Sequence, residues 1–483
     1  MKKFAIPQDL TKALHFIGGS RLNLLSPHKF MVMEPRNGSH LTECCSAERS
    51  QVEEAVLISR KAQKFWAAMP WLERGHILRR AAELIRSHVN EISLWEVRDN
   101  GKPIREAKAD VLSCAETFEY FSGVDLSGQH IPYSDQDSRF AYTRREPLGV
   151  VGAVGAWNYP IQTATWKIAP AIACGNAIVY KPSPLAPISA VILAQLLQCA
   201  GVPNGIVNIV QGEAITGTAI CESTGINKVS FTGSSSTGKK IVETCAKIHV
   251  KPVTLELGGK SSCIIFEDAD MEMAVNGAMM ANFFSQGQKV AESTAQLVIG
   301  DPLNEATHVG ASISNEHMKK VKGYIDGAIK QGAKLIYGGE PVSVEGLESG
   351  FYLSPCILSG VTRGMTVYHE EIFGSVMLII PFESDEEALK MANDTEFGLA
   401  AGVFTNDLSR AHSFAAMLEA GTVYINTFND VSPLVPFGGF KQSGFGRENG
   451  RSAIEAYSQI KSVFVNTSKR LENAFQVISA GEL

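Results

Sequence analysis

The stretch KVSFTGSSSTGKKIVETCAKIHVKPVTLELGGK, residues 228–260, contains two short apolar segments separated by one with helical spacing. Strands are expected at Lys228–Thr232 and Val253–Glu256, with a helix between them at 236–247. A strand, a helix and another strand in this order form a βαβ unit, whose two strands are parallel. Residues 228–260 therefore predict part of a parallel sheet covered by helices.

The same alternation occurs upstream of this unit. Three further strands are expected at 150–154, 177–180 and 206–210, and three further helices at 161–173, 187–200 and 214–222. Five strands joined by four helical crossovers predict an α/β fold with a doubly wound parallel sheet of the Rossmann type. Ligands of such sheets bind at the carboxyl ends of the strands. We therefore expect the functional site at that edge.

Two other regions flank this sheet. An all-helical segment is expected before it, with helices at 50–68, 72–85 and 107–121, while residues 1 to about 45 show little periodicity. After residue 261 a second α/β region is expected, with elements at 263–266, 271–284, 318–331, 334–337, 377–380, 385–392, 400–404, 407–418 and 422–426. The chain therefore predicts two α/β units.

The composition limits the classes of function. The chain has 483 residues, of which 45% are hydrophobic and 19% charged, so it is globular and large enough for several domains. Its net charge of -6 offers no positive field for nucleic acid or for an anionic membrane surface. Its nine cysteines lack CxxC spacing, which indicates free thiols in a reducing compartment and no metal site. We expect a cytoplasmic protein that acts on small molecules, without a secretory signal peptide or a membrane-spanning segment, and a short amphipathic transit peptide stays an alternative.

Two features of residues 228–260 have the chemistry of a binding or catalytic site. Glu256 lies between Leu255 and Leu257, and burial of this strand would raise its pKa toward that of a general base. The alternative is a strand end whose glutamate faces water. Gly233 and Ser234 begin the turn before the expected helix, where free N–H groups attract a phosphate. The alternative there is an ordinary helix N-cap, since the dinucleotide fingerprint GxGxxG is absent.

Five motifs follow one another along the chain: AWNYP at 156–160, FTGSSSTG at 231–238, LELGGK at 255–260, EEIFG at 370–374 and PFGGFKQSGFGREN at 436–449. Together they resemble the NAD(P)-dependent aldehyde dehydrogenase superfamily over nearly the whole chain, with its betaine-aldehyde and trimethylaminobutyraldehyde branch nearest. The resemblance implies an NAD(P)-binding domain of residues 1–125 and 147–257, a catalytic domain of 258–445, and oligomerisation elements at 126–146 and 446–483. It also implies that a strand at 140–145 and the tail after Ser458 pair in a small sheet.

The resemblance assigns cofactor residues for NAD, and NADP is not excluded. It places Lys181 on the adenine ribose, Ser234 on the pyrophosphate and Glu371 on the nicotinamide ribose. The full set of expected cofactor residues is Trp157, Lys181, Ser183, Gly233, Ser234, Leu257, Glu371 and Phe373. Taken alone, a lysine after a strand is usually a solvated strand end. The chain departs from the family at Pro184, where NAD-preferring members often have Glu, and at Ser375, where the family usually has Pro.

For catalysis, the resemblance assigns Asn158 as the oxyanion donor and Glu256 as the base that activates water. From the residues alone, Asn158 is more simply a cap for the helix that starts at Pro160. Tyr159 and Trp166 lie seven residues apart, and the resemblance places both in the substrate tunnel, where aromatic faces attract an amino or trimethylammonium group. Core packing is the usual explanation for such a pair. The expected substrate is therefore a small aldehyde, with an aminoaldehyde as the candidate class. No metal is expected.

One part of the family's site is absent. The run QGQ at 286–288 corresponds to the residues that precede the family's nucleophilic cysteine, but Lys289 follows here, and no cysteine lies between Cys263 and Cys356. By the resemblance, about twenty residues are deleted at this point. Cys263 and Cys356 occur in apolar strand patterns and are expected to be buried structural thiols. The catalytic sheet then lacks an interior strand and must either close up or expose unpaired backbone groups.

The sequence leaves three functions open. The chain is a variant of an active NAD-dependent aldehyde dehydrogenase, an NAD-binding pseudoenzyme that assembles with active subunits, or a structural partner that binds no cofactor. For the polypeptide as it stands we expect no aldehyde oxidation, because neither Ser293 nor Thr294 offers the nucleophilicity of a thiolate. A homo-oligomer, either a dimer or a tetramer, is expected by the resemblance.

Overall fold

The structure, a computed structural model, describes residues 6, 10–133, 138–282, 291, 293–468 and 471. Its centre is a sheet whose eight strands follow one another as β2 (Ser20–Leu22), β1 (His15–Ile17), β9 (Val207–Ile209), β8 (Ala177–Lys181), β7 (Val150–Val154), β10 (Lys228–Thr232), β11 (Val253–Glu256) and β20 (Gly444–Phe445). The five strands from β9 to β11 are parallel. The predicted doubly wound sheet is confirmed, and the two strands of residues 228–260 lie side by side.

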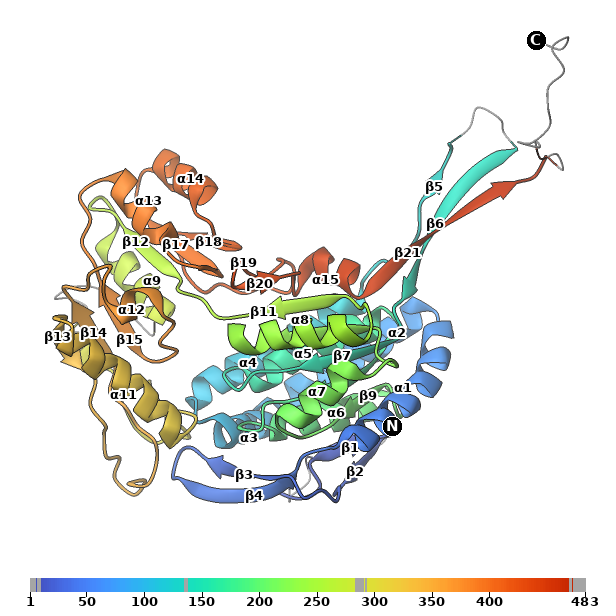
Figure 1. Ribbon diagram of the computed structural model, residues 1–483, viewed down its shortest axis with the longest axis horizontal. Helices are drawn as coiled ribbons and strands as arrows, with labels where there is room; N and C mark the ends of the chain where they lie inside the picture. Colours follow the sequence, from blue (N-terminus) through green and yellow to red (C-terminus); the bar gives the residue numbers. More distant parts are fainter. Residues whose placement is uncertain are drawn as a thin grey trace, which may run out of the picture.

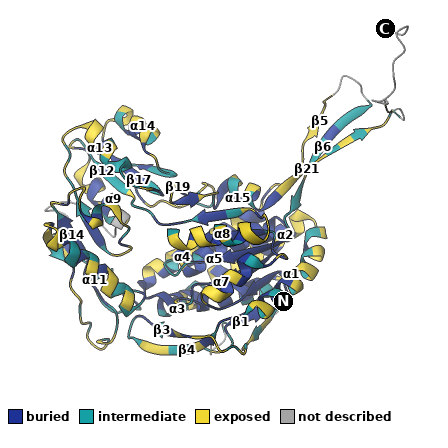
Figure 2. Cartoon of the chain, in the orientation of Figure 1, coloured by how far each residue is buried: buried dark blue, intermediate teal, exposed yellow. Residues whose placement is uncertain are grey.

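Helices cover both faces of this sheet (Figure 1). On one face lie α1 (Arg49–Ala68), α7 (Ala214–Glu222) and α8 (Ser235–Ile248), and on the other lie α2 (Trp71–Ser87), α4 (Ile104–Ser122), α5 (Pro160–Ala173) and α6 (Ile188–Ala200). Successive strand residues point to opposite faces. Accordingly Val150 packs in one buried cluster and Val151 in the other. Both clusters contribute to the continuous buried core in Figure 2.

Several elements near the N-terminus were not predicted. The strands β1 and β2 extend the sheet beyond β9. A hairpin is formed by β3 (Lys29–Glu34) and β4 (Ser39–Cys45), and a further helix, α3 (Val89–Asn100), joins the expected ones. The weak periodicity of residues 1 to about 45 therefore gave no prediction of these strands. Strands of three residues are too short to show a period of two, so their pairing is decided by the neighbouring chain.

The second α/β region is divided into two three-stranded sheets (Figure 1). One contains β12 (Ser262–Ile265), β17 (Ala400–Phe404) and β18 (Thr422–Ile425); the other contains β13 (Lys334–Gly338), β14 (Cys356–Ser359) and β15 (Val376–Ile379). Their helices are α9 (Met271–Asn282), α11 (Asn315–Lys330), α12 (Thr366–His369), α13 (Asp385–Asn393) and α14 (Leu408–Met417). Within the described chain, β12 and β15 are both edge strands, so the sheet has not closed up.

A third sheet projects from the body as an arm (Figure 1). It consists of β5 (His130–Ile131), β6 (Arg139–Pro147) and β21 (Ser458–Asn466), with β6 and β21 paired over their full length. The predicted pairing of the 140–145 strand with the tail after Ser458 is therefore confirmed. The short elements β16 (Phe397–Gly398), β19 (Phe440–Lys441) and α15 (Gly450–Ala456) complete the described fold. No helix in the described ranges is both long and apolar enough to cross a membrane.

Candidate active site

A cavity of about 640 Å³ opens at the carboxyl ends of β7, β10 and β11. It lies where the strand order reverses, since the chain leaves β7 toward β8 on one side and returns as β10 on the other. Parallel sheets bind ligands at such a point. Every residue expected to bind the cofactor, and both expected catalytic residues, line this cavity: Trp157, Asn158, Lys181, Ser183, Gly233, Ser234, Glu256, Leu257, Glu371 and Phe373.

Glu256 is the last residue of β11, and its Oε2 accepts a hydrogen bond of 3.1 Å from Thr232 Oγ1. Gly444 of β20 pairs with Glu256 at φ +119°, and a Cβ there would lie 2.0 Å from Leu255 O, so only glycine allows this approach. Burial raises the pKa of Glu256 from 4.5 to about 7, although the charge of Lys167 opposes the shift. A carboxyl with this pKa both accepts and releases a proton near neutral pH. The alternative of a fully solvated glutamate is therefore wrong.

A buried ion pair supports Glu256 from behind. Lys167 Nζ of α5 donates to Glu448 Oε1 at 2.7 Å and to Thr232 Oγ1 at 2.8 Å, and the Lys167 and Glu448 side chains are 0% and 1% exposed. Ser230 Oγ also donates to Glu448 Oε1, at 3.2 Å. Hydrogen bonds therefore connect Glu448, Lys167, Thr232 and Glu256 in sequence. This network fixes the position of the Glu256 carboxyl.

Sequence reasoning missed both members of this ion pair. Glu448 lies within the quoted motif at 436–449, and Lys167 is the one charged residue in the expected helix at 161–173. A charge in an otherwise apolar buried helix needs a partner, because an unpaired buried charge is costly. That isolated lysine was the available signal, although its partner 281 residues away is found only by folding.

Asn158 lies half-buried in the cavity wall between β7 and α5. It does not cap α5, because the N-cap residue is Tyr159 and no side chain caps this helix end. Instead, Asn100 Nδ2 donates to the backbone oxygens of Trp157 and Asn158, at 2.5 and 3.4 Å. Within the described chain no side chain bonds the Asn158 carboxamide. Its N–H groups are therefore available to a ligand.

The turn at Gly233 and Ser234 starts α8, a helix of 14 residues. Ser234 is the N-cap, and its side chain accepts from Thr237 N at 3.4 Å. The N-cap alternative is therefore observed, but it does not exclude phosphate binding, because the first N–H groups of a helix and its dipole remain at that end. Both residues line the cavity, so the positive end of α8 faces it.

Lys181 is not a solvated strand end, because its residue is only 5% exposed. Its Nζ donates to Pro182 O at 2.7 Å and to Gly212 O at 2.8 Å, and burial lowers its pKa from 10.5 to about 8. The ammonium has three donors, of which these two bonds use two. Ser183 follows in the same wall of the cavity, where its hydroxyl accepts from Leu185 N at 3.2 Å.

An aromatic cluster closes the other end of the cavity. The rings of Trp157 and Phe373 meet edge to face at 5.1 Å, and His317 packs on Trp157 at 4.9 Å. His317 Nε2 also lies 2.7 Å from Phe373 O, and Phe373 has a left-handed φ of +56°, which is rare for an aromatic residue. Glu371 accepts from Gly259 N at 2.9 Å. His317 lines the cavity and was not predicted, since a histidine in an ordinary amphipathic helix gives no signal.

Tyr159 and Trp166 do not line this cavity among its described wall residues. Tyr159 is 38% exposed, with Lys102 Nζ 4.2 Å above its ring. Trp166 is 5% exposed and packs against Phe437 at 5.4 Å, while its Nε1 has no hydrogen-bond partner among the described residues. The structure therefore does not bring them to Glu256, and their role in binding substrate stays a prediction.

No thiol in the described chain stands beside Glu256 and Asn158. Cys221 is the one cysteine in the described wall of the cavity, and its free thiol shares a hydrogen bond with that of Cys245 of α8. Burial raises the pKa values of Cys263 and Cys356 to about 12, so both are poor nucleophiles. Cys356 is fully buried as expected, whereas Cys263 is half-buried and lines a second cavity. The expected nucleophile position after residues 286–288 lies outside the described residues.

The described residues contain no group of three or more His, Cys, Asp or Glu side chains that could hold a metal ion. The polar groups around the cavity are instead a carboxyl of raised pKa, a free carboxamide, a buried ammonium and a helix N-terminus. These groups suit an organic cofactor that carries phosphates, together with proton transfer at Glu256.

The fold and this site together define the class of protein. The sequence model of the aldehyde dehydrogenase family matches residues 25–294 and 288–463, so the chain belongs to the aldehyde dehydrogenase family. It is 47% identical over 478 residues to 4-trimethylaminobutyraldehyde dehydrogenase A of Danio rerio, covering 94% of this chain and 93% of that protein. It is 46% identical over 493 residues to 4-trimethylaminobutyraldehyde dehydrogenase of Homo sapiens, covering 96% of this chain and 99% of that protein.

Solved structures agree with the family assignment. PnpE from Pseudomonas sp. WBC-3 superposes with a TM-score of 0.91 at 37% identity, covering 95% of this chain and 99% of that chain. Betaine aldehyde dehydrogenase of Staphylococcus aureus, solved in complex with NAD+, superposes with a TM-score of 0.91 at 32% identity, covering 96% of this chain and 97% of that chain. The resemblance that the five motifs indicated is therefore confirmed at the level of family and fold.

Proposed function

We propose that this member of the aldehyde dehydrogenase family binds NAD in the 640 Å³ cavity and does not itself oxidise aldehydes. The proposal rests on one observation. The cavity brings Glu256 and Asn158 together with the groups that suit a dinucleotide, while its described cysteine, Cys221, is a thiol hydrogen-bonded to Cys245. The relative from Staphylococcus aureus is solved in complex with NAD+, which supports the choice of cofactor.

The residues around the cavity fit NAD in three places. Lys181 and Ser183 are available to the adenine ribose hydroxyls, and the N-terminal end of α8 with Ser234 is available to the pyrophosphate. At the other end, Glu371 is available to the nicotinamide ribose, with the aromatic cluster around Phe373 beside the ring. When bound, NAD supplies an acceptor for hydride.

Glu256 and Asn158 keep the proton chemistry of the family's site. Glu256, with a pKa of about 7, takes a proton from a water molecule, and the Thr232–Lys167 network holds its carboxyl in place. Asn158 donates an N–H to an oxygen that develops negative charge, which is worth about 3 to 4 kcal/mol in other enzymes. In the family's mechanism the Asn158 bond would form during the attack of a thiolate on the aldehyde and the proton transfer at Glu256 would follow it, so without the thiol neither group has a substrate to act on.

Two features of the family matches support a deletion near residue 288. The family model matches the chain in two pieces that meet at residues 288–294. The alignment with the human relative spans 493 positions, more than the 483 residues of this chain, so it opens gaps on this side. A deletion at this position removes the nucleophile segment and leaves the cofactor half complete.

Two measurements test the proposal together. Calorimetry with NAD should give saturable binding, and an assay of NADH absorbance with betaine aldehyde should give no turnover. A matched variant that restores a cysteine-bearing segment after Gln288, designed on the relatives, should gain activity, since loss of a nucleophile costs about a millionfold in rate. The absence of NAD binding would refute the cofactor assignment. Turnover by the unmodified chain, with or without a thiol-blocking reagent, would refute the inactivity.

The substrate class we propose for the restored variant is an aminoaldehyde or trimethylammonium aldehyde. The relatives at 46 to 47% identity are 4-trimethylaminobutyraldehyde dehydrogenases, which supports this substrate class. The restored variant should therefore prefer betaine aldehyde to hexanal in kcat/KM. A preference for the neutral aldehyde would refute this assignment.

The arm of β5, β6 and β21 is the proposed oligomerisation element. It projects from the body, and it exposes large apolar side chains, of which Phe464 and Ile460 are 68% and 60% exposed. Exposed apolar patches of this kind mark interfaces. Light scattering should give the mass of a dimer or tetramer for the full chain. A Phe464→Glu variant should shift the oligomeric state toward the monomer. A wild-type chain that scatters as a monomer would refute the proposal.

A further inference from the structure

The helices α7 and α8 pack against each other, and both contribute to the wall of the 640 Å³ cavity. Their wall residues are three or four positions apart in each helix, which places them on one face of that helix. These residues are Ala214, Gly217, Thr218 and Cys221 of α7, and Thr237, Lys240, Ile241 and Thr244 of α8. We call this part of the cavity the helix groove.

Two cysteines meet where the helix groove approaches the C-terminal ends of α7 and α8. Cys221 is the last of the α7 wall residues, and Cys245 directly follows Thr244, the last of the α8 wall residues. Both cysteines are free thiols in the same buried cluster, and the Cys221 thiol donates a hydrogen bond to the Cys245 sulfur. The cavity wall therefore contains one cysteine that has a second thiol within hydrogen-bond reach.

A buried lysine stabilises negative charge on this pair. Lys251 Nζ donates to Cys221 O at 3.0 Å and to Ser223 O at 2.7 Å, so its ammonium lies at the C-terminal end of α7. The hydrogen bond from Cys221 lowers the pKa of Cys245, and the charge of Lys251 adds to this effect, although burial opposes it. The thiolate is the form of cysteine that reacts with oxidants. The pair therefore has the local chemistry of a reactive dithiol.

Other cysteines of the described chain show the contrast. Burial raises the pKa values of Cys263 and Cys356 to about 12, and no second thiol in the described chain donates to either sulfur to offset this. Cys44 and Cys45 are consecutive residues of β4, so their side chains point to opposite faces of the hairpin. Closeness to a second thiol and to an ammonium thus distinguishes Cys221 and Cys245.

We propose that Cys221 and Cys245 form a redox-active dithiol, which hydrogen peroxide oxidises to a reversible disulfide and which NAD shields when it fills the helix groove. The thiolate of the pair attacks one oxygen of the peroxide and breaks the O–O bond, which gives a sulfenic acid and water. The second sulfur then attacks the sulfenic sulfur, whose oxygen leaves as water. Two thiols and one peroxide give one disulfide and two waters, so two electrons pass from the sulfurs to the peroxide.

The two parts of this proposal depend on different features. The oxidation depends on the two thiols and on Lys251, and peroxide reaches them from the cavity because Cys221 is part of its wall. The shielding rests on the proposed function, because it requires NAD in the same cavity. In a reducing compartment a disulfide of this kind is transient, so the dithiol is the resting state.

Peptide mapping of the full-length chain tests the disulfide. Cleavage after glutamate releases residues 214–222 and 244–256, and each of these peptides contains one cysteine. After treatment with hydrogen peroxide and alkylation of the remaining thiols, mass spectrometry should find the two peptides linked, and dithiothreitol should separate them. The proposal is overturned if the two peptides stay unlinked, or if their cysteines become sulfinic or sulfonic acids instead.

Two variants with the same chemical change test the role of the ammonium. Lys251→Met should slow the formation of the link at least about threefold, because the thiolate loses its positive neighbour. Lys247→Met, on the exposed face of α8, should leave the rate unchanged. Equal rates in the two variants would overturn the role of Lys251. The peptide map of the wild-type chain decides the disulfide even if Lys251→Met does not fold.

NAD tests the shielding, with its binding measured by calorimetry on the same preparation. At a saturating concentration NAD should slow the formation of the link at least about tenfold, because little of the protein then has an empty groove. Binding of NAD without protection would overturn the shielding. If NAD does not bind, the proposed cofactor and the shielding fail together, whereas the peptide map without NAD still confirms or refutes the disulfide.

Discussion

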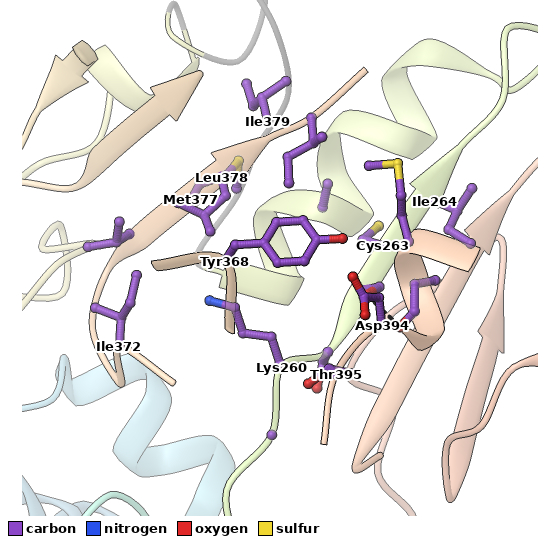
Figure 3. Close-up of a pocket in the computed structure, with 18 of the residues that line it drawn as sticks. Lys260, Cys263, Ile264, Tyr368, Ile372, Met377, Leu378, Ile379, Asp394 and Thr395 are labelled. Atoms are coloured by element: carbon purple, nitrogen blue, oxygen red, sulfur yellow. Dashed lines mark hydrogen bonds between the residues drawn. The ribbon is translucent and has the colours of Figure 1, made fainter. Parts of the chain in front are cut away.

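The cofactor-binding sheet and the region after residue 261 are built from the same strand and helix units, but only the first forms a continuous sheet. Each of its five parallel strands has a partner on both sides, and helices bury both faces. The second region contains two three-stranded sheets, whose edge strands β12 and β15 line the walls of a second cavity of about 430 Å³ (Figure 3). The difference teaches that neighbouring strands, and not the local sequence of each strand, decide whether a parallel sheet is complete.

The sharpest test of the cofactor half is its buried ion pair. Replacing Glu448 by Gln leaves the Lys167 ammonium buried without a carboxylate, and we expect a loss of about 3 to 5 kcal/mol in unfolding free energy. The control is Glu455→Gln, which breaks an exposed pair with Arg451 and should cost less than about 1 kcal/mol. Chemical unfolding at fixed protein concentration measures both. Equal losses would mean that the network around Glu256 does not stabilise the cofactor half.

Local stability tests the difference between the two regions directly. Native-state hydrogen exchange should be at least about a hundredfold slower for the amides of β10, which lies between two strands, than for those of β12, which is an edge strand in the described chain. The amides of both strands are measured in one experiment on the wild-type chain, so no variant is needed. Equal protection of β10 and β12 would contradict the view that the second region is the less stable one.

The pH dependence of stability tests the desolvation of Glu256. Its pKa is about 7 in the folded chain and 4.5 in the unfolded one, so the folded state binds the proton more tightly. The unfolding free energy therefore falls as the pH rises from 4.5 to 7 and is constant with respect to this group above 7. Glu256→Gln should be more stable than wild type by about 1 to 3 kcal/mol at pH 8 and nearly equal to it at pH 4.5. An unchanged difference between the two pH values would show that Glu256 is solvated.

The smallest expected effect concerns Lys181. Lys181→Met keeps the buried stem but removes the ammonium from the cavity wall, and we expect NAD affinity to fall about tenfold. Lys239→Met, on the exposed side of α8, is the control. Isothermal calorimetry with NAD measures both variants. An unchanged affinity for Lys181→Met would remove this lysine from the cofactor site.

Much of the fold was predictable because the helices and strands of the cofactor half are long and apolar. The expected strands at 150–154 and 228–232 match β7 and β10 in full. Among the strands that were missed, β1, β2 and β20 have two or three residues each, too few to show a period of two, so only their pairing with a neighbouring strand defines them. The helix α3 was missed as well, and its apolar positions pack against several different elements.

The candidate site was predictable where a motif marked it. Asn158, Ser234 and Glu256 were found in this way, and the cavity brings them together. Lys167 and His317 lie outside the quoted motifs, and their roles depend on partners that are distant in the chain. Burial also decided between alternatives that the sequence left open, because the pKa of Glu256 depends on its surroundings and not on its neighbours in sequence.

The sequence by itself determined the order of strands and helices, the family, and the absence of a cysteine between Cys263 and Cys356, because these depend on local pattern and on residue identity alone. Only the tertiary structure decided that Glu256 is held by the Lys167–Glu448 pair and that β12 and β15 line the walls of one cavity. Both arrangements depend on contacts between residues that are far apart in the chain. Such contacts stabilise the protein only after folding has closed the long loops between these residues.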